Sequence, residues 1–384
     1  MEFFGYIRSL FLLSLPLIGG HIAQILIGVG DTFIVGRYST EALAALVLGT
    51  TIFFIIFIFG AGFSFAAMAL VSTANTEGNT LKIRRITRMA LWLSLIFGFL
   101  VSPFFVFSEK LLLLLGQELN LAVLASEYLI YSGIAIFPAL SSSVLRCYLA
   151  GMEYVKVTFY ISIIAVLLNL LINYLLVFGM FGLPELGIVG AGIATVFVNL
   201  FMLISFVIYA KIKLPQHKLF VRFWRPDRGV IGLVLKMGSA IGITNMAEAG
   251  LFSASSIMMG WVGQLELAAH GIALQLASIT FMLHLGLSDA ATIRVSAALG
   301  KTDKNKIINE CCAALVISLG LSSLAIMIFL GFPKFLVSAF LNSEELNTIL
   351  IIEMGISLLV LAALFADLLL PFVPETLREF VAFL

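Results

Sequence analysis

Two stretches that lie 224 residues apart decide the fold: residues 43–74, LAALVLGTTIFFIIFIFGAGFSFAAMALVSTA, and residues 267–298, LAAHGIALQLASITFMLHLGLSDAATIRVSAA. Aligned without a gap, they are identical at 12 of 32 positions, and the identities include Gly62 with Gly286. Each stretch is apolar and longer than the roughly 20 residues that a helix needs to cross a bilayer. The chain is therefore expected to contain two related halves built from membrane-spanning helices.

The composition places most of the chain in or against lipid. Of 384 residues, 61% are hydrophobic and 11% are charged, whereas about 25% of a soluble chain is charged. The balance of 22 Lys and Arg against 21 Asp and Glu gives no electrostatic attraction for nucleic acid. Three cysteines make no disulfide framework, and the first apolar stretch is too long for a cleavable signal peptide. A secreted domain, a nucleic-acid binder and an ordinary cytosolic enzyme are excluded.

Ten apolar runs predict ten transmembrane helices. They are apolar on all sides and show no period of two, which favours helices over a β-barrel. The expected spans are 11–35, 45–70, 88–108, 121–145, 156–178, 187–210, 231–260, 266–290, 308–331 and 346–370. With the N-terminus inside, 19 of the 22 Lys and Arg residues fall on the inner side. Because cytoplasmic loops carry an excess of positive charge, both ends of the chain are expected in the cytoplasm.

The repeat pairs the second expected span with the eighth. An even separation of six spans keeps the same direction across the membrane, so the repeats are parallel and related by an axis along the membrane normal. We expect an all-α polytopic membrane protein with two parallel six-helix lobes, the second incomplete. The predicted parts are an N-lobe over 1–210, a basic cytoplasmic linker over 211–229, a C-lobe with four helices over 230–370, and an atypical tail over 371–384. This architecture predicts a transporter with a central cleft.

Polar residues inside the spans are the candidates for function, because a charge at the bilayer centre costs about 2.5–3.5 kcal/mol on insertion scales. In the first span, His21, Gln24, Gly28 and Asp31 are spaced by three, four and three residues and share one helical face. A carboxylate with an amide nearby can bind a small cation, or can hold a proton when burial disfavours its charge. The alternative for Asp31 is an interhelical hydrogen-bond network near the outer end of the span.

Other spans carry matching polar groups. Glu248 of the seventh span lies 224 residues after Gln24, so the two halves present polar groups at equivalent places; the alternative is a buried neutral carboxyl. The fifth and sixth spans each carry two polar residues four apart, whose oxygens suit Na⁺ but serve equally as helix–helix hydrogen bonds. These are Asn169 and Asn173, and Thr195 and Asn199.

The remaining polar residues have structural interpretations. Asp289 and Arg294 are expected to stabilise the inner end of the eighth span, and His270 and His284 are expected to be packing residues, so no metal site is predicted. The sequence shows no phosphate loop, nucleophile elbow or zinc-protease histidine pair, so no enzyme is expected. Because the sequence has no phosphate loop for ATP, an ion gradient is the expected source of energy for transport.

Several motifs resemble those of a known transporter family. The most specific is ELAAHGIALQ at 266–275, followed by FMLHLG at 281–286, AATIRV at 290–295 and ALGKTD at 298–303. Further matches are GDT at 30–32, GR at 36–37, Asn169 with Asn173-Tyr174, and GIVGAGIAT at 187–195. Over residues 5–366 the chain is similar to the multidrug and toxic compound extrusion family, especially its NorM-type bacterial branch.

The resemblance implies a twelve-helix antiporter of the bacterial cytoplasmic membrane. Such a protein exports cationic, amphipathic drugs by alternating access, driven by Na⁺ or H⁺ and without a further cofactor. We expect a monomer in the lipid bilayer with no nucleic-acid partner. The resemblance also implies that the carboxylates that bind the cation or proton correspond to Asp31, to Glu248 and, in the tenth span, to Asp367. The implied polar partners of Asp31 are Gln24, Asn169, Asn173 and Thr195.

The chain departs from the family pattern at two places. Gly271 stands where the family usually has Gln, and after about Phe365 the sequence gives way to a tail unlike the family's last helices. At about 20 residues a span, roughly 60–70 residues are expected to be missing. A truncated, non-transporting remnant is therefore one alternative. The other is a lipid-linked oligosaccharide flippase, which would need a basic cleft, although few Lys or Arg residues lie inside these spans.

Overall fold

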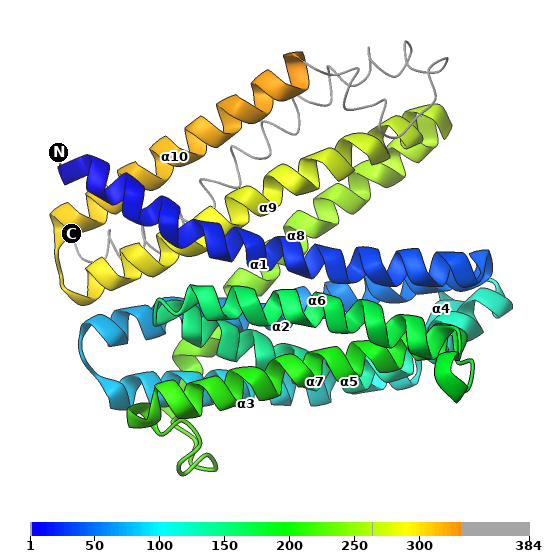
Figure 1. Cartoon of the computed structure of the whole chain (residues 1–384), viewed down its shortest axis with the longest axis horizontal. Coiled ribbons are helices and arrows are strands. Elements are labelled where there is room, and N and C mark those ends of the chain that lie inside the picture. The colour runs from blue at the N-terminus through cyan, green and yellow to red at the C-terminus, as the bar shows by residue number, and fades with distance from the viewer. Residues whose placement is uncertain (1, 263, 332–384) are drawn as a thin grey trace. The chain divides into compact units, whose positions relative to one another are not determined.

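The structure, a computed structural model, describes residues 2–262 and 264–331 and is helical nearly throughout (Figure 1). The long helices are α1 (Glu2–Tyr38), α2 (Thr40–Thr76), α3 (Thr80–Val106), α5 (Leu119–Gly151), α6 (Val155–Val177), α7 (Gly187–Lys213), α8 (Arg228–Val262), α9 (Gln264–Gly300) and α10 (Lys304–Gly331). The short elements are α4 (Ser108–Leu114) and two 3-10 turns, η1 (Met180–Gly182) and η2 (Pro215–His217). Among the described residues, eight helices are long and apolar enough to cross a membrane.

The predicted all-α class is confirmed. Seven of the first nine expected spans lie within a long helix of the described ranges, and the other two, at 88–108 and 156–178, run one or two residues past the ends of α3 and α6. The tenth, at 346–370, lies outside the described residues. Most of the helices are longer than the apolar runs, and two of them begin at polar caps. The Ser39 hydroxyl accepts from the main-chain N of Glu41 at the start of α2, and Asn79 accepts from the main-chain N of Lys82 at the start of α3.

The chain divides into two compact units. The larger comprises Ala23–Ala247 and Ser296–Asp303. Among the described residues, the smaller comprises the start of α1 as far as Ile22, Glu248–Val295, and the chain from Lys304 onwards. The division into lobes over 1–210 and 230–370, with a linker over 211–229 and a tail over 371–384, stays a prediction.

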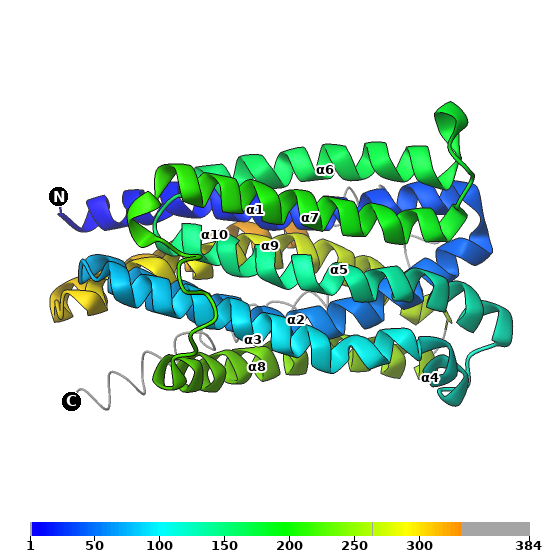
Figure 2. The same ribbon diagram turned by 90° about the horizontal axis from the view of Figure 1, so that it is seen from below.

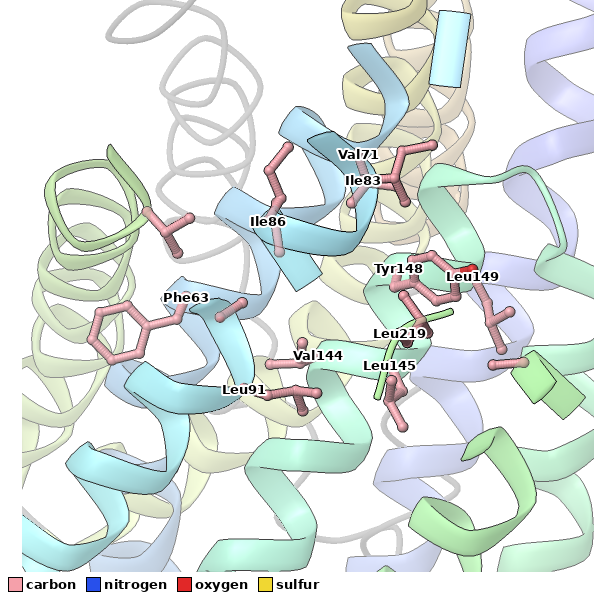
Figure 3. Close-up of a cluster of buried hydrophobic side chains, with 14 of the residues drawn as sticks. Phe63, Val71, Ile83, Ile86, Leu91, Val144, Leu145, Tyr148, Leu149 and Leu219 are labelled. Atoms are coloured by element: carbon pink, nitrogen blue, oxygen red, sulfur yellow. The ribbon is translucent and has the colours of Figure 1, made fainter. Parts of the chain in front are cut away.

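Helix α5 is the central helix of the larger unit. It contacts α2, α3, α4, α6 and α7, and 72% of its apolar segment is buried, against 22% for α2 and 39% for α7 (Figure 2). Small residues make this position possible. A Cβ at Gly133 would lie 2.5 Å from Cβ of Phe105, so glycine lets α3 pack directly against the α5 backbone. One end of this bundle is filled by a cluster of buried apolar side chains from α2, α3 and α5 together with Leu219 (Figure 3).

The two glycines that the repeat aligns make equivalent helix contacts. A Cβ at Gly62 of α2 would lie 2.7 Å from the main-chain N of Gly242 in α8, within the larger unit. A Cβ at Gly286 of α9 would lie 2.6 Å from the main-chain N of Ile18 in α1, within the smaller unit. Gly242 and Ile18 are themselves 224 residues apart. The two halves of the sequence therefore repeat a backbone-to-backbone helix crossing as well as a pattern of residues.

We expect Gly62→Ala to lower the free energy of unfolding by about 1–3 kcal/mol, because overpacking against backbone atoms forces two helices apart. Rotation of a side chain cannot relieve the clash with the added methyl group, because the nearest atoms belong to the main chain of Gly238 and Gly242. Thermal unfolding in detergent measures the effect. Gly232→Ala, on α8, is the matched control because a Cβ there meets nothing within 4 Å. Equal stability of the two variants would contradict the close crossing.

Candidate functional site

The candidate site is centred on the carboxylate of Asp31, which is 4% exposed in the larger unit. Two amides of α6 donate to its Oδ1 atom: Nδ2 of Asn169 at 2.9 Å and Nδ2 of Asn173 at 2.6 Å. Both asparagines are fully buried. The structure thus brings together three of the predicted residues, from two helices, in one hydrogen-bonded cluster inside an apolar bundle.

The same amides carry two carbonyl oxygens that are available to a ligand. Oδ1 of Asn169 and Oδ1 of Asn173 are buried and have no hydrogen-bond partner among the described residues. A buried polar atom without a partner costs about 1–3 kcal/mol, so each oxygen would be stabilised by a cation or a water molecule. Carboxylate and amide oxygens are hard ligands, which suit small hard cations.

The close approach of α1 and α6 at this cluster depends on Gly30. A Cβ at Gly30 would lie 2.7 Å from Cδ2 of Leu170 and 3.3 Å from Oδ1 of Asn169. Asn169 and Asn173 lie four residues apart and so share the face of α6 that meets α1. Glycine next to the carboxylate therefore leaves the space through which the two amides reach it.

Further polar groups near the carboxylate come from α5 and α7. Tyr128 of α5 is buried and interacts with Asp31, Ser132 and Thr195. Tyr128 was not among the predicted site residues. The sequence feature that accompanies it is Gly49 of α2. A Cβ at Gly49 would lie 2.6 Å from Cδ1 of Tyr128, so glycine leaves room for the tyrosine ring. Thr195 as a partner of Asp31 stays a prediction.

Asn199 and Thr195 also bond within their own helix. Nδ2 of Asn199 donates to the main-chain O of Thr195 at 2.8 Å, and Oγ1 of Thr195 donates to the main-chain O of Ala191 at 3.0 Å. Asn199 is only partly buried. A role for Asn199 in binding an ion or a substrate stays a prediction.

Two other candidate residues, Gln24 and Glu248, belong to different units. Gln24 is exposed on α1 and belongs to the larger unit, whereas Glu248 is partly buried on α8 and belongs to the smaller unit. Their equivalence in the repeat therefore stays a prediction. Asp367 lies outside the described residues.

Asp289 and Arg294 lie on α9, which continues to Gly300, and both contact other helices of the smaller unit. Their role in stabilising the inner end of the eighth span stays a prediction. Asp289 Oδ2 lies 2.8 Å from Nε2 of His21 on α1, and both residues are buried. Arg294 Nε lies 3.5 Å from Oε1 of Glu310 on α10. The apolar run of the eighth span was expected to end at residue 290, whereas helix α9 continues to Gly300.

Long apolar helices around a buried polar cluster define a multi-pass α-helical membrane protein. A family model described as MatE matches residues 16–175 and 240–379. The chain therefore belongs to the MatE family, which confirms the resemblance read from its motifs.

Curated relatives and solved structures agree with this assignment. The chain is 40% identical over 366 residues to the "Probable multidrug resistance protein NorM" of Agrobacterium fabrum, covering 95% of this chain and 79% of that protein. It is 39% identical over 362 residues to the protein of the same name from Rhizobium meliloti, covering 94% and 78%. A crystal structure of a eukaryotic MATE transporter shares the fold with a TM-score of 0.81 at 18% identity, covering 95% of this chain and 81% of that one. A MATE structure in the bent conformation gives a TM-score of 0.82 at 17% identity, covering 97% and 84%.

Proposed function

We propose that the chain is a cation-coupled multidrug efflux antiporter that exports cationic, amphipathic compounds by alternating access. One observation carries this function: in a MatE family member, a buried carboxylate is held by two amides whose own carbonyl oxygens have no partner among the described residues. The names of the relatives, probable multidrug resistance proteins, support the substrate class. The proposed location is the bacterial cytoplasmic membrane, with both ends of the chain in the cytoplasm.

The proposed coupling is competition for a negative charge. Asp31 attracts either the coupling ion, Na⁺ or H⁺, or the drug cation, because Na⁺ and the drug compensate its charge in an apolar surrounding and H⁺ removes it. Entry of the coupling ion from outside lowers the affinity for the drug, and the reciprocal effect follows by linkage. Glu248 and Asp367 are the proposed further carboxylates of the cycle, and Gln24 and Asn199 the proposed polar partners. The protein moves its substrates and makes or breaks no covalent bond.

A lipid-linked oligosaccharide flippase is disfavoured because Arg88 and Arg294 already have partners within the protein. Nη1 of Arg88 donates to the main-chain O of Arg222 at 2.7 Å, and Arg294 is paired with Glu310. A diphosphate needs guanidinium or ammonium groups that are available to it. The described spans instead offer a buried carboxylate with carbonyl oxygens, which favours a cation.

The function is tested with the full chain in proteoliposomes that contain a lipophilic cationic dye. We expect dye movement opposite to an imposed gradient of Na⁺ at constant pH, or of H⁺ in the absence of Na⁺, and whichever gradient drives exchange identifies the coupling ion. An anionic dye of similar size is the control and should not move. If correctly inserted protein exchanges the cationic dye under neither gradient, the proposed function is wrong.

A further inference from the structure

The segment between α7 and α8 is anchored to the helix bundle rather than loose. We call residues 214–228 the linker platform. Arg88 of α3 donates from Nη1 to the main-chain O of Arg222 at 2.7 Å, and Trp92 donates from Nε1 to the main-chain O of Phe223 at 2.9 Å. The Trp92 and Phe223 rings stack with centroids 5.9 Å apart. Two side chains of α3 therefore fix the backbone of the platform at its turn.

Further anchors hold both ends of the platform. His217 is buried, and its Nδ1 lies 2.5 Å from the hydroxyl of Tyr148 on α5. Leu219 packs into the apolar cluster beside Tyr148 (Figure 3). At the other end, Asp227 lies 3.4 Å from Nη1 of Arg85, and its main-chain N donates to Sδ of Met89 at 3.2 Å. The platform is a built surface of the larger unit.

Positive charge dominates what this surface exposes. Residues 214–228 contain four Lys and Arg residues and one acidic residue, Asp227, whose charge is partly offset by Arg85. Burial lowers the pKa of His217, so the neutral ring adds no charge. The exposed basic side chains of the platform are Lys218, Arg222, Arg225 and Arg228, and the exposed Lys211 and Lys213 precede them in the last turn of α7.

The backbone at two of these residues is one that glycine would adopt more easily. Lys218 has a φ of 46° and Arg222 a φ of 57°, both in the left-handed region that L-residues with side chains rarely occupy. Basic, exposed side chains stand at both strained positions, next to the buried anchors. Residues in such sparsely populated backbone conformations cluster at functional sites.

Trp224 adds an apolar contact to this charged surface. It is 72% exposed and stands between Arg222 and Arg225, with Val221 also exposed. An exposed indole flanked by guanidinium groups suits the headgroup region of a membrane, where tryptophan is enriched at both interfaces. Basic clusters beside a transmembrane helix attract anionic lipids of the cytoplasmic leaflet.

We propose that the linker platform is a binding surface for anionic phospholipid headgroups. The phosphate groups contact Lys218, Arg222 and Arg225, and Trp224 lies at the level of the headgroups. The proposal rests on the proposed cytoplasmic side of the linker. Its test is nevertheless independent of transport, because it measures lipid binding to the purified chain.

The test titrates the full chain in detergent with phosphatidylglycerol and, separately, with phosphatidylcholine, and follows binding by native mass spectrometry. We expect phosphatidylglycerol to bind selectively. The variant K218Q/R222Q/R225Q should bind it on the order of 100-fold more weakly, since three charges near the headgroup are lost. The matched control is K301Q/K304Q/K306Q, which removes three charges from the turn after α9 and the start of α10 and should keep the wild-type affinity.

Two further measurements distinguish a bound lipid headgroup from a free phosphate ion on the same basic side chains. Phosphatidylglycerol with a spin-labelled headgroup should quench the part of the fluorescence that Trp224→Phe removes. Inorganic phosphate at the same concentration should not displace the lipid. Unchanged affinity in the platform variant, equal loss in the control variant, or full displacement by inorganic phosphate would each overturn the lipid assignment.

Discussion

Asp31→Asn is expected to reduce gradient-driven export to the level of protein-free vesicles while leaving the fold intact. Asparagine has nearly the same shape, and its Oδ1 can still accept from Asn169 and Asn173, which donate to Asp31 at 2.9 Å and 2.6 Å. What disappears is the charge and the ability to take up a proton. The variant therefore separates the electrostatic role of the cluster from its role in packing α1 against α6.

The expected size follows from Coulomb's law. A unit charge about 4 Å from a cation contributes about 4 kcal/mol at an effective dielectric constant of about 20, and desolvation of the carboxylate offsets part of it. We therefore expect cation binding to weaken by about 100-fold, since each 1.4 kcal/mol is about a factor of ten. Dye exchange in proteoliposomes measures the effect. Glu109→Gln removes an exposed carboxylate from α4 and should leave export unchanged. Undiminished export by Asp31→Asn would remove Asp31 from the coupling mechanism.

The sequence was sufficient for the helices and for most members of the Asp31 cluster. Apolar runs and their length predicted nine helices of the described ranges, and the spacing of Asn169 and Asn173 placed both on one face of α6. Spacing alone could not show that this face meets Asp31, because periodicity defines a face of one helix and not its neighbour. That information lies in the small residues, such as Gly30, which decide where two helices can approach.

Long-range partners were harder to predict for the same reason. His21 shares a face with Gln24 and Asp31 in the sequence, yet its partner is Asp289, which is 268 residues away. Arg88 was expected only as a positive charge on the inner side, and it instead donates to the carbonyl of Arg222 in the linker. In both cases, neither the order of the residues nor the composition could predict which partner the side chain would contact. The repeat aligned Gly62 with Gly286, and the structure shows that both lie at equivalent close crossings.

Asp289→Ala is expected to lower the free energy of unfolding by about 2–3 kcal/mol, because removing one partner leaves the other buried polar group without its hydrogen bond. Nε2 of His21 lies 2.8 Å from Oδ2 of Asp289, and both side chains are at least nine-tenths buried. Without the carboxylate, the imidazole of His21 stays in an apolar place with no acceptor at that distance. The close crossing of Ile18 and Gly286 leaves little room for it to move away.

The cause is isolated by a double-mutant cycle with His21→Ala, measured as equilibrium unfolding in mixed micelles. The double variant should be clearly more stable than the sum of the two single effects predicts, because no buried polar group is left unpaired once both partners are absent.

His284→Ala is the comparison variant. His284 is also buried on α9 but bonds to the hydroxyl of Ser322 at 3.0 Å, so a loss of about 1–2 kcal/mol is expected. A large coupling energy between His21 and Asp289 would show that the pair stabilises the smaller unit, to which both residues belong. Additive single effects would show that the two residues do not depend on each other.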